Sequence, residues 1–171
     1  MRHIFLLPFV LILLTSCTSG DDVNRYTGKA LEYELFQAND AYNYSGTVVF
    51  KEIQNGQIET VIRLSGDKGT ETYYFPAHLH FGPYDAPDAP MAAMLTPVDI
   101  KTLESLTIVG ELSNGETLSF EDLQDFDGHI KVHLASDGPD YHVILVAGNI
   151  GANADTGVLD RSKMTLCAPN Y

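Results

Sequence analysis

The histidines of this chain have the residue type and spacing that point most directly to chemistry. His78 and His80 flank Leu79 in a segment that alternates along a predicted strand. Successive side chains of a β-strand point to opposite faces, so the two histidines share one face, while Ala77, Leu79 and Phe81 form the core face. Two imidazoles on a non-core face indicate a candidate metal site, because neutral imidazole is a common ligand of zinc and copper.

A second histidine-bearing segment lies near the end of the chain. A turn centred on Asp137 and Gly138 predicts a hairpin that sets Val132 opposite Val143 on an apolar face and His133 opposite His142 on the other face. Directly opposed residues have Cβ atoms about 4.5–5.5 Å apart, which suits two imidazoles that share one metal ion. This register requires a four-residue loop, because a loop of three or five residues would break the pairing.

The predicted metal ligands are therefore His78, His80, His133 and His142, with His129 and Lys131 further along the same face. If the two segments form neighbouring strands, these imidazoles converge outside the sheet, beneath a proline-rich stretch at residues 82–97. The candidate metal is copper or zinc. The alternative is that these are ordinary solvated or cross-strand histidines.

The elements that would position these side chains are mostly β-strands. Short alternating segments are separated by glycine, asparagine, aspartate and proline, including the turn signals Asn55–Gly56 and Asn114–Gly115. The pattern predicts an all-β, antiparallel Greek-key-type sandwich or barrel with one short helix and a long proline-rich loop. The expected strands cover residues 31–35, 46–53, 58–65, 72–81, 105–112, 128–136 and 141–147, with a last edge strand near 163–166. Ser119 is a candidate N-cap for the helix, which would end near Phe126, and residues 91–95 form a short turn of helix or strand.

The first residues predict export and lipidation. The apolar run from Ile4 to Leu14 is shorter than the roughly 20 residues of a membrane-spanning helix, so residues 1–16 fit a signal peptide. Residues 14–17, Leu-Thr-Ser-Cys, resemble the lipobox of bacterial lipoproteins. The resemblance implies that Cys17 becomes the acylated N-terminus, carrying chains such as palmitate that hold the protein on a bilayer. The alternative is an ordinary signal peptide with an incidental cysteine.

The mature chain is organised as a tether and one domain. Residues 17–27 lack apolar periodicity and predict a lipidated tether, followed by a single β-sandwich domain at 28–171. Asp21 and Asp22 resemble the acidic stretch that directs some lipoproteins of Gram-negative bacteria to the cell surface. The expected location is therefore the outer membrane or cell surface, with the periplasmic face as the alternative.

Composition excludes several classes of function. The formal net charge is −13, which argues against nucleic acid or anionic headgroups as partners. Once Cys17 is acylated, Cys167 is the other cysteine of the chain and has no partner for an internal disulfide. The sequence has no P-loop, no Gly-x-Ser-x-Gly elbow and no His-Glu-x-x-His motif.

Three short segments resemble a CHRD domain, the β-rich module named after chordin. They are PAHLHFG at residues 76–82, GHIKVHL at 128–134 and AGNIG at 147–151. On this resemblance His78, His80 and His133 match recurring histidines, whereas His129 and His142 do not. The family's Gly-Glu-Ile-Arg-Gly ending is replaced here by a different sequence around residues 146–148. The resemblance implies a β-sandwich without an assigned catalytic activity.

The same histidines resemble, more distantly, the copper site of Cu/Zn superoxide dismutase. His78, His80 and His133 would match three copper ligands. The chain departs from that family because residues 82–97 contain no histidine to bridge two metals and because no intrasubunit disulfide can form.

The sequence therefore predicts a membrane-anchored CHRD-like binding or envelope module, non-catalytic, with a metal at the histidine face. The first alternative is a copper or zinc metalloenzyme of superoxide-dismutase-like type. The second is capture of a carbohydrate or protein ligand by the loop that carries Pro83, Tyr84, Pro87 and Pro90.

Overall fold

The computed structural model describes residues 25–87, 89–154 and 159–166. The predicted signal peptide, Cys17, most of the tether and Cys167 lie outside the described residues. The first strand begins at Tyr26, so the last two residues of the predicted tether already belong to the barrel.

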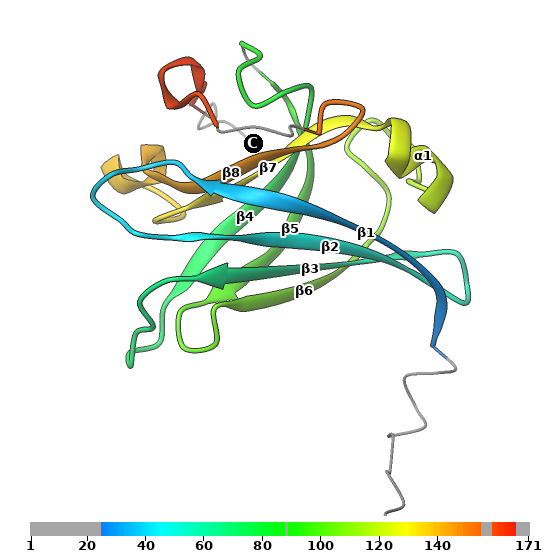
Figure 1. The fold of residues 1–171 in the computed structure, drawn as a ribbon, viewed down its shortest axis with the longest axis horizontal. Helices are drawn as coiled ribbons and strands as arrows, with labels where there is room; N and C mark the ends of the chain where they lie inside the picture. The colour runs from blue at the N-terminus through cyan, green and yellow to red at the C-terminus, as the bar shows by residue number, and fades with distance from the viewer. Residues whose placement is uncertain (1–24, 88, 155–158, 167–171) are drawn as a thin grey trace, which may run out of the picture.

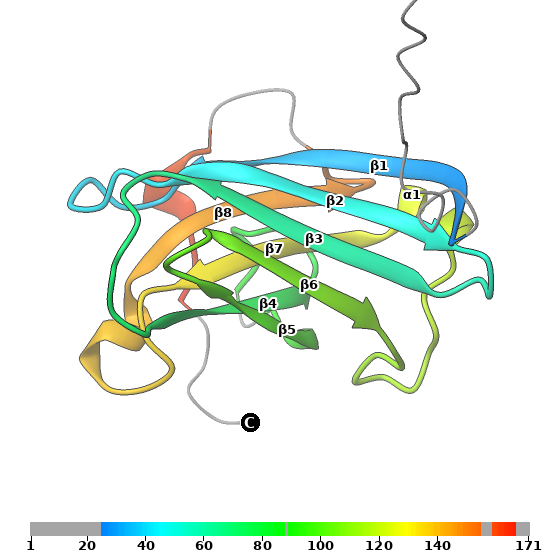
Figure 2. The ribbon, with the colours of Figure 1, turned by 90° about the horizontal axis from the view of Figure 1, so that it is seen from below.

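Eight strands of the described residues close into one antiparallel barrel in the order β1-β2-β3-β6-β5-β4-β7-β8 (Figures 1 and 2). The strands are β1 (Tyr26–Gln37), β2 (Ser45–Ile53), β3 (Ile58–Ser65), β4 (Tyr74–Phe81), β5 (Met91–Asp99), β6 (Glu104–Val109), β7 (Asp127–His133) and β8 (Ile144–Gly151). Strands β4, β5 and β6 are consecutive neighbours, and the next strand along the chain, β7, returns to pair with β4. This return of the fourth strand to the side of the first is a Greek-key arrangement. The predicted all-β Greek-key fold is thus confirmed, in its barrel form.

The barrel interior holds the main hydrophobic core. The alternation read from the sequence explains it, because every second residue of each strand points inward. In β4, Ala77 and Leu79 are almost fully buried in this core, and in β7 Ile130 and Val132 are fully buried in it. Phe50 contributes an edge-on ring contact with Tyr33 at 6.1 Å between centroids.

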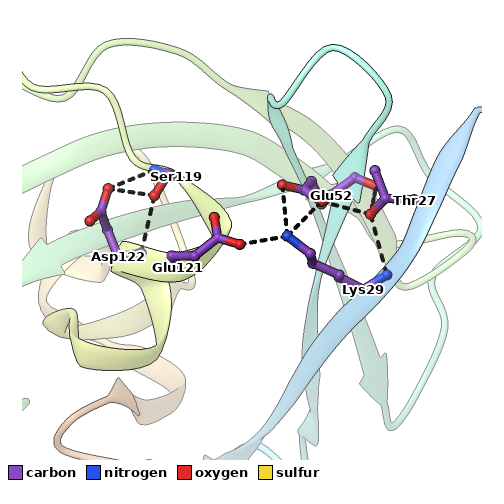
Figure 3. A network of polar contacts seen from close by, with 6 residues as sticks. All are labelled: Thr27, Lys29, Glu52, Ser119, Glu121 and Asp122. Atoms are coloured by element: carbon purple, nitrogen blue, oxygen red, sulfur yellow. Dashed lines mark hydrogen bonds and ion pairs between the residues drawn. The ribbon is translucent and has the colours of Figure 1, made fainter.

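The one short helix, α1 (Phe120–Asp125), begins at Ser119 as the sequence predicts. The Ser119 hydroxyl accepts a hydrogen bond from the Asp122 backbone N–H, and the Asp122 carboxylate accepts one from the Ser119 backbone N–H, which is a capping box. Lys29 of β1 lies between Glu121 of the helix and Glu52 of β2 (Figure 3), so an ion-pair bridge ties α1 to the barrel wall.

Two segments in the second half of the chain differ from the prediction in extent or type. Residues 91–95 are strand, which is one of the two predicted alternatives, but the strand β5 is longer than predicted and continues past Pro97 to Asp99. Pro97 is accommodated because the pairing of β5 with β4 shifts register between Phe75 and Ala77, and bulges tolerate proline. The edge strand predicted near residues 163–166 does not form: a 3₁₀ helix, η2 (Arg161–Lys163), ends at Lys163, and residues 164–166 belong to no strand.

Candidate functional site

The two histidine-bearing segments are direct neighbours in the barrel. Strand β4 pairs with β7 along five residue pairs, which set His80 opposite His129 and His78 opposite Lys131. Because the alternate residues of both strands fill the barrel core, these side chains lie on the outer face of the wall. The condition on which the sequence prediction depended, adjacency of the two strands, is met.

Four imidazoles form a continuous group on this wall, which we call the histidine cluster: His78, His80, His129 and His133. The rings of His80 and His129 are stacked, with centroids 4.8 Å apart and planes 9° apart. His78 lies between the two ends of the group, 5.8 Å from His80 and 5.1 Å from His133 between ring centroids. His133 in turn stacks on Tyr141 at 4.8 Å.

The cluster is on the outside of the barrel yet shielded from solvent. Each of its four side chains is at most 4% exposed, because two segments cover the wall. One is the loop after β4, of which residues 82–87 and 89–90 are described, and the other is a C-terminal strap, which we define as residues 159–166. Both lie on the same side of the barrel as β7 and β8 (Figure 1). The predicted cover by the proline-rich stretch is therefore present, and the strap adds to it.

Hydrogen bonds join the strap, the loop and the wall. The Thr165 hydroxyl donates to the backbone carbonyl of Ala86 at 2.8 Å, and the Thr165 carbonyl accepts from Lys131 Nζ at 2.6 Å. The Asp160 backbone N–H donates to the Tyr84 hydroxyl at 3.1 Å. A small apolar cluster joins Leu159 of the strap to Tyr84 of the loop and to Ile144 and Ala147 of β8.

Three of the four imidazoles are held in one tautomer by backbone carbonyls. Nδ1 of His129 lies 2.7 Å from the Gly82 carbonyl oxygen, Nδ1 of His133 lies 2.7 Å from that of Tyr141, and Nδ1 of His80 lies 3.2 Å from that of Ala89. A carbonyl oxygen only accepts hydrogen bonds, so Nδ1 carries the proton and Nε2 carries the lone pair. Nε2 of His129 is buried without a hydrogen-bond partner among the described residues.

The cluster is neutral at neutral pH. Burial lowers the pKa of His78, His80 and His133 to about 4 and that of His129 to about 3. Desolvation is the main cause, since it penalises the charged imidazolium. The positive charge of Lys131 lowers the pKa of His80, His129 and His133 further.

His142 is not part of the group, which corrects the predicted hairpin. Residues 139–142 form a 3₁₀ helix, η1 (Pro139–His142), with Pro139 at its start. Strand β8 begins only at Ile144, which pairs with His133 next to a bulge, and the His142 side chain is exposed. The fourth member of the histidine cluster is instead His129, which pairs with His80. His129 and His133 are four residues apart on one strand, so their side chains share a face. This spacing was the signal in the sequence that His129 belongs with the other histidines.

The present ring arrangement is not that of an assembled metal site. Among the described residues, no three or more histidine, cysteine, aspartate or glutamate side chains are placed to hold one ion. The donor chemistry nevertheless fits, because a metal-ligating histidine usually donates its other ring N–H to a carbonyl or carboxylate. The cluster supplies that arrangement at three of its four rings.

A surface groove with acidic residues lies elsewhere on the described part of the protein. A groove of about 870 Å³ runs beside α1, and its lining includes the carboxylates of Glu116, Glu121, Asp122, Asp125 and Asp127. Glu121 is paired with Lys29 and Asp122 closes the capping box. These two carboxylates therefore have structural partners, and none of the four cluster histidines lines the groove.

No family model, curated protein or solved structure matches this chain. The described residues contain no helix long and apolar enough to cross a bilayer.

Proposed function

We propose that this protein is a lipid-anchored, non-catalytic module of the bacterial cell envelope that binds copper or zinc at the histidine cluster. One observation carries the metal-binding part: four neutral imidazoles lie together, and three of them have Nδ1 fixed on a backbone carbonyl. That pattern prepares Nε2 for a metal ion. His78, His80 and His133, which lie in the CHRD-like motifs, are three of the proposed ligands. His129 is the fourth and replaces His142 in the predicted ligand set.

The envelope part of the proposal rests on the N-terminal sequence. The apolar run and the Leu-Thr-Ser-Cys motif support acylation of Cys17, and the Asp21–Asp22 pair supports display at the outer membrane or cell surface. The charge of −13 supports a domain held away from anionic headgroups by its tether. The partners proposed are thus the bilayer, through acylated Cys17, and a metal ion.

Metal titration of the purified chain tests this function. We expect one equivalent of Cu or Zn to bind the wild-type chain and to raise its unfolding temperature by mass action. Substitution of His78 and His80 by alanine should abolish both effects, whereas His142→Ala, which changes an exposed imidazole outside the cluster, should retain them. A wild-type chain that remains metal-free after dialysis against either ion, with unchanged thermal stability, would contradict the proposal.

Dismutation of superoxide is the second candidate function. It is favoured by the 5.1 Å separation between the rings of His78 and His133, because both match copper ligands in the superoxide-dismutase resemblance. We place it second because residues 82–97 supply no bridging histidine. Turnover of superoxide by the copper-loaded chain, lost in the variant with alanine at His78 and His80, would reverse this order.

Ligand capture by the loop after β4 has less support. Tyr84 is only 7% exposed and its ring packs in the apolar cluster that joins the loop to the strap and β8. The aromatic side chain expected to meet a ligand therefore serves as packing between loop, strap and wall.

A further inference from the structure

Two methionines extend the donor set of the histidine cluster. Strand β5 lies on the other side of β4 (Figure 2), and the register sets Met94 opposite His78 and Met91 opposite His80. Opposed residues of an antiparallel pair share a face, with Cβ atoms about 4.5–5.5 Å apart. The register therefore places both methionines beside the part of β4 that carries His78 and His80, with a register shift between the Leu79 and His80 pairs.

The burial pattern of β5 supports this orientation. Ala92 and Leu95 are almost fully buried in the barrel core, at 1% and 4% exposed. Met94 is 72% exposed, while its cross-strand neighbour His78 is 4% exposed. The wall thus has a sulfur donor at its solvent-facing margin and nitrogen donors under cover.

Mixed sulfur and imidazole donors discriminate between metals. Thioether and thiolate ligands are soft and select Cu(I), whereas Zn(II) takes thiolate, imidazole and carboxylate but is not a typical partner of thioether sulfur.

The charge at the wall favours the same choice. Lys131 lies opposite His78 in the register, is 1% exposed and donates to the Thr165 carbonyl. Its positive charge already opposes protonation of three cluster histidines. Coulomb repulsion scales with the charge of the incoming ion, so the ammonium opposes a divalent cation about twice as strongly as a monovalent one.

We propose that the ion bound at this wall is Cu(I), with the thioethers of Met94 and Met91 as ligands beside His78 and His80. This inference rests on the proposed function, because it assigns the ion and two further ligands of the same site. It adds a specificity that histidines alone do not give.

Competition titrations of matched variants test the assignment. The lipidated chain is extracted in detergent with Cys167→Ser, which removes a thiol that would itself bind Cu(I). Bathocuproine disulfonate competes for Cu(I) under ascorbate without oxygen, and a zinc-binding dye competes for Zn(II). The variants are Met94→Leu, Met91→Leu and both together. Met164→Leu is the control, because that side chain packs on the apolar cluster that joins the strap to the loop and β8.

We expect the double variant to lose about tenfold or more in Cu(I) affinity, with zinc binding and unfolding temperature unchanged. The control should behave as the parent chain. X-ray absorption of the Cu(I)-loaded parent should show a sulfur shell that disappears in the double variant. Met94 is exposed and leucine conserves the volume, so misfolding does not obscure the result.

The possible failures are distinguishable. If the chain binds copper or zinc through His78 and His80 but Met94→Leu and Met91→Leu leave Cu(I) affinity and the absorption spectrum unchanged, only the thioether assignment is overturned. If the parent binds Zn(II) in preference to Cu(I), the choice of ion is overturned. If it binds neither, the proposed function fails and this inference fails with it.

Discussion

At the scale of single residues, the four imidazoles of the histidine cluster are both buried and uncharged at neutral pH. Four imidazoles are covered without a charge on any of them, and the backbone carbonyls of Gly82, Ala89 and Tyr141 accept hydrogen bonds from Nδ1 of three of them. Nε2 of His129 is buried without a hydrogen-bond partner among the described residues. A buried polar atom without a hydrogen-bond partner lowers the stability of the folded protein. A bound ligand would relieve this cost by supplying the missing partner.

Stability of the metal-free protein should depend on pH through these rings. Burial lowers the pKa of His129 from 6.5 to about 3, so the unfolded chain takes up a proton first as the pH falls. The free energy of unfolding is therefore highest above pH 6.5 and declines from there toward pH 3, by about 1.4 kcal/mol per pH unit for one group. Urea unfolding of the chelator-treated chain between pH 7 and pH 5 measures this decline.

A single substitution isolates the contribution of one ring to that slope. His129→Gln should reduce the loss of stability between pH 7 and pH 5 by about 2 kcal/mol, because one of the coupled groups no longer titrates. His142→Gln, at an exposed position on η1, should show the full wild-type loss. Parallel curves for His129→Gln and the wild-type chain would show that burial of this ring is not linked to protonation.

At the scale of elements, the position of the cluster depends on how the barrel closes. Strands β1 and β8 pair only at Phe36 with Ala147 and at Gln37 with Val146. Gly148 follows directly, and a Cβ there would lie 2.2 Å from the carbonyl oxygen of Glu34. The backbones approach so closely that glycine is required for closure, and β8 in turn holds β7 in place.

Gly148→Ala should therefore destabilise the barrel. Overpacking of a tight site typically costs about 1–3 kcal/mol, and here the obstacle is backbone rather than a flexible side chain. Gly110→Ala is the matched control, because a Cβ at Gly110 would meet nothing within 4 Å. Equilibrium unfolding in urea compares the two. Equal stability of both variants would mean that β1 and β8 can separate without loss.

The strap is a second element that can be tested. Thr165→Val removes the hydroxyl that donates to the carbonyls of Tyr84 and Ala86. A loss of about 1 kcal/mol in strap docking corresponds to roughly a fivefold higher open fraction. Diethyl pyrocarbonate should then modify the cluster histidines about fivefold faster, with exposed His142 of the same molecule as reference. Ser162→Ala, whose hydroxyl bonds only within the strap to Asp160, should leave the rate unchanged; faster modification there too would implicate the strap's internal turn instead.

Elements were predictable where the residue pattern is local. The alternation in β1 to β4, the Asn55–Gly56 turn and the Ser119 capping box follow from neighbouring residues alone, and the structure confirms them. The hairpin register after β7 was not predictable in this way. Pro139 starts a 3₁₀ turn and a bulge at His133 shifts the pairing, so His129 rather than His142 completes the group. The pairing of β4 with β7 follows from the Greek-key topology. Sequence periodicity predicts strands but does not specify which strands pair.

At the scale of the whole molecule, the net charge opposes membrane binding and the proposed lipid anchor favours it. The chain carries a formal net charge of −13, so an anionic bilayer repels the domain. Two cations near the start of the barrel are already paired with carboxylates: Arg25 pairs with Glu59, and Lys29 pairs with Glu52 and Glu121 (Figure 3). The described domain therefore offers little electrostatic attraction of its own to a membrane, and attachment depends on the lipid proposed at Cys17.

Cys17→Ala tests that dependence. In cell fractionation the wild-type chain should sediment with membranes, because two or more acyl chains give stable anchoring. The variant should appear in the soluble fraction with the barrel intact, as judged by its unfolding transition. Protease added to whole cells then reports the side of the membrane: surface display predicts cleavage of the wild-type domain, and protection places it on the periplasmic face. Retention of Cys17→Ala on washed membranes would show instead that the domain binds the bilayer or another envelope component directly, despite its negative charge.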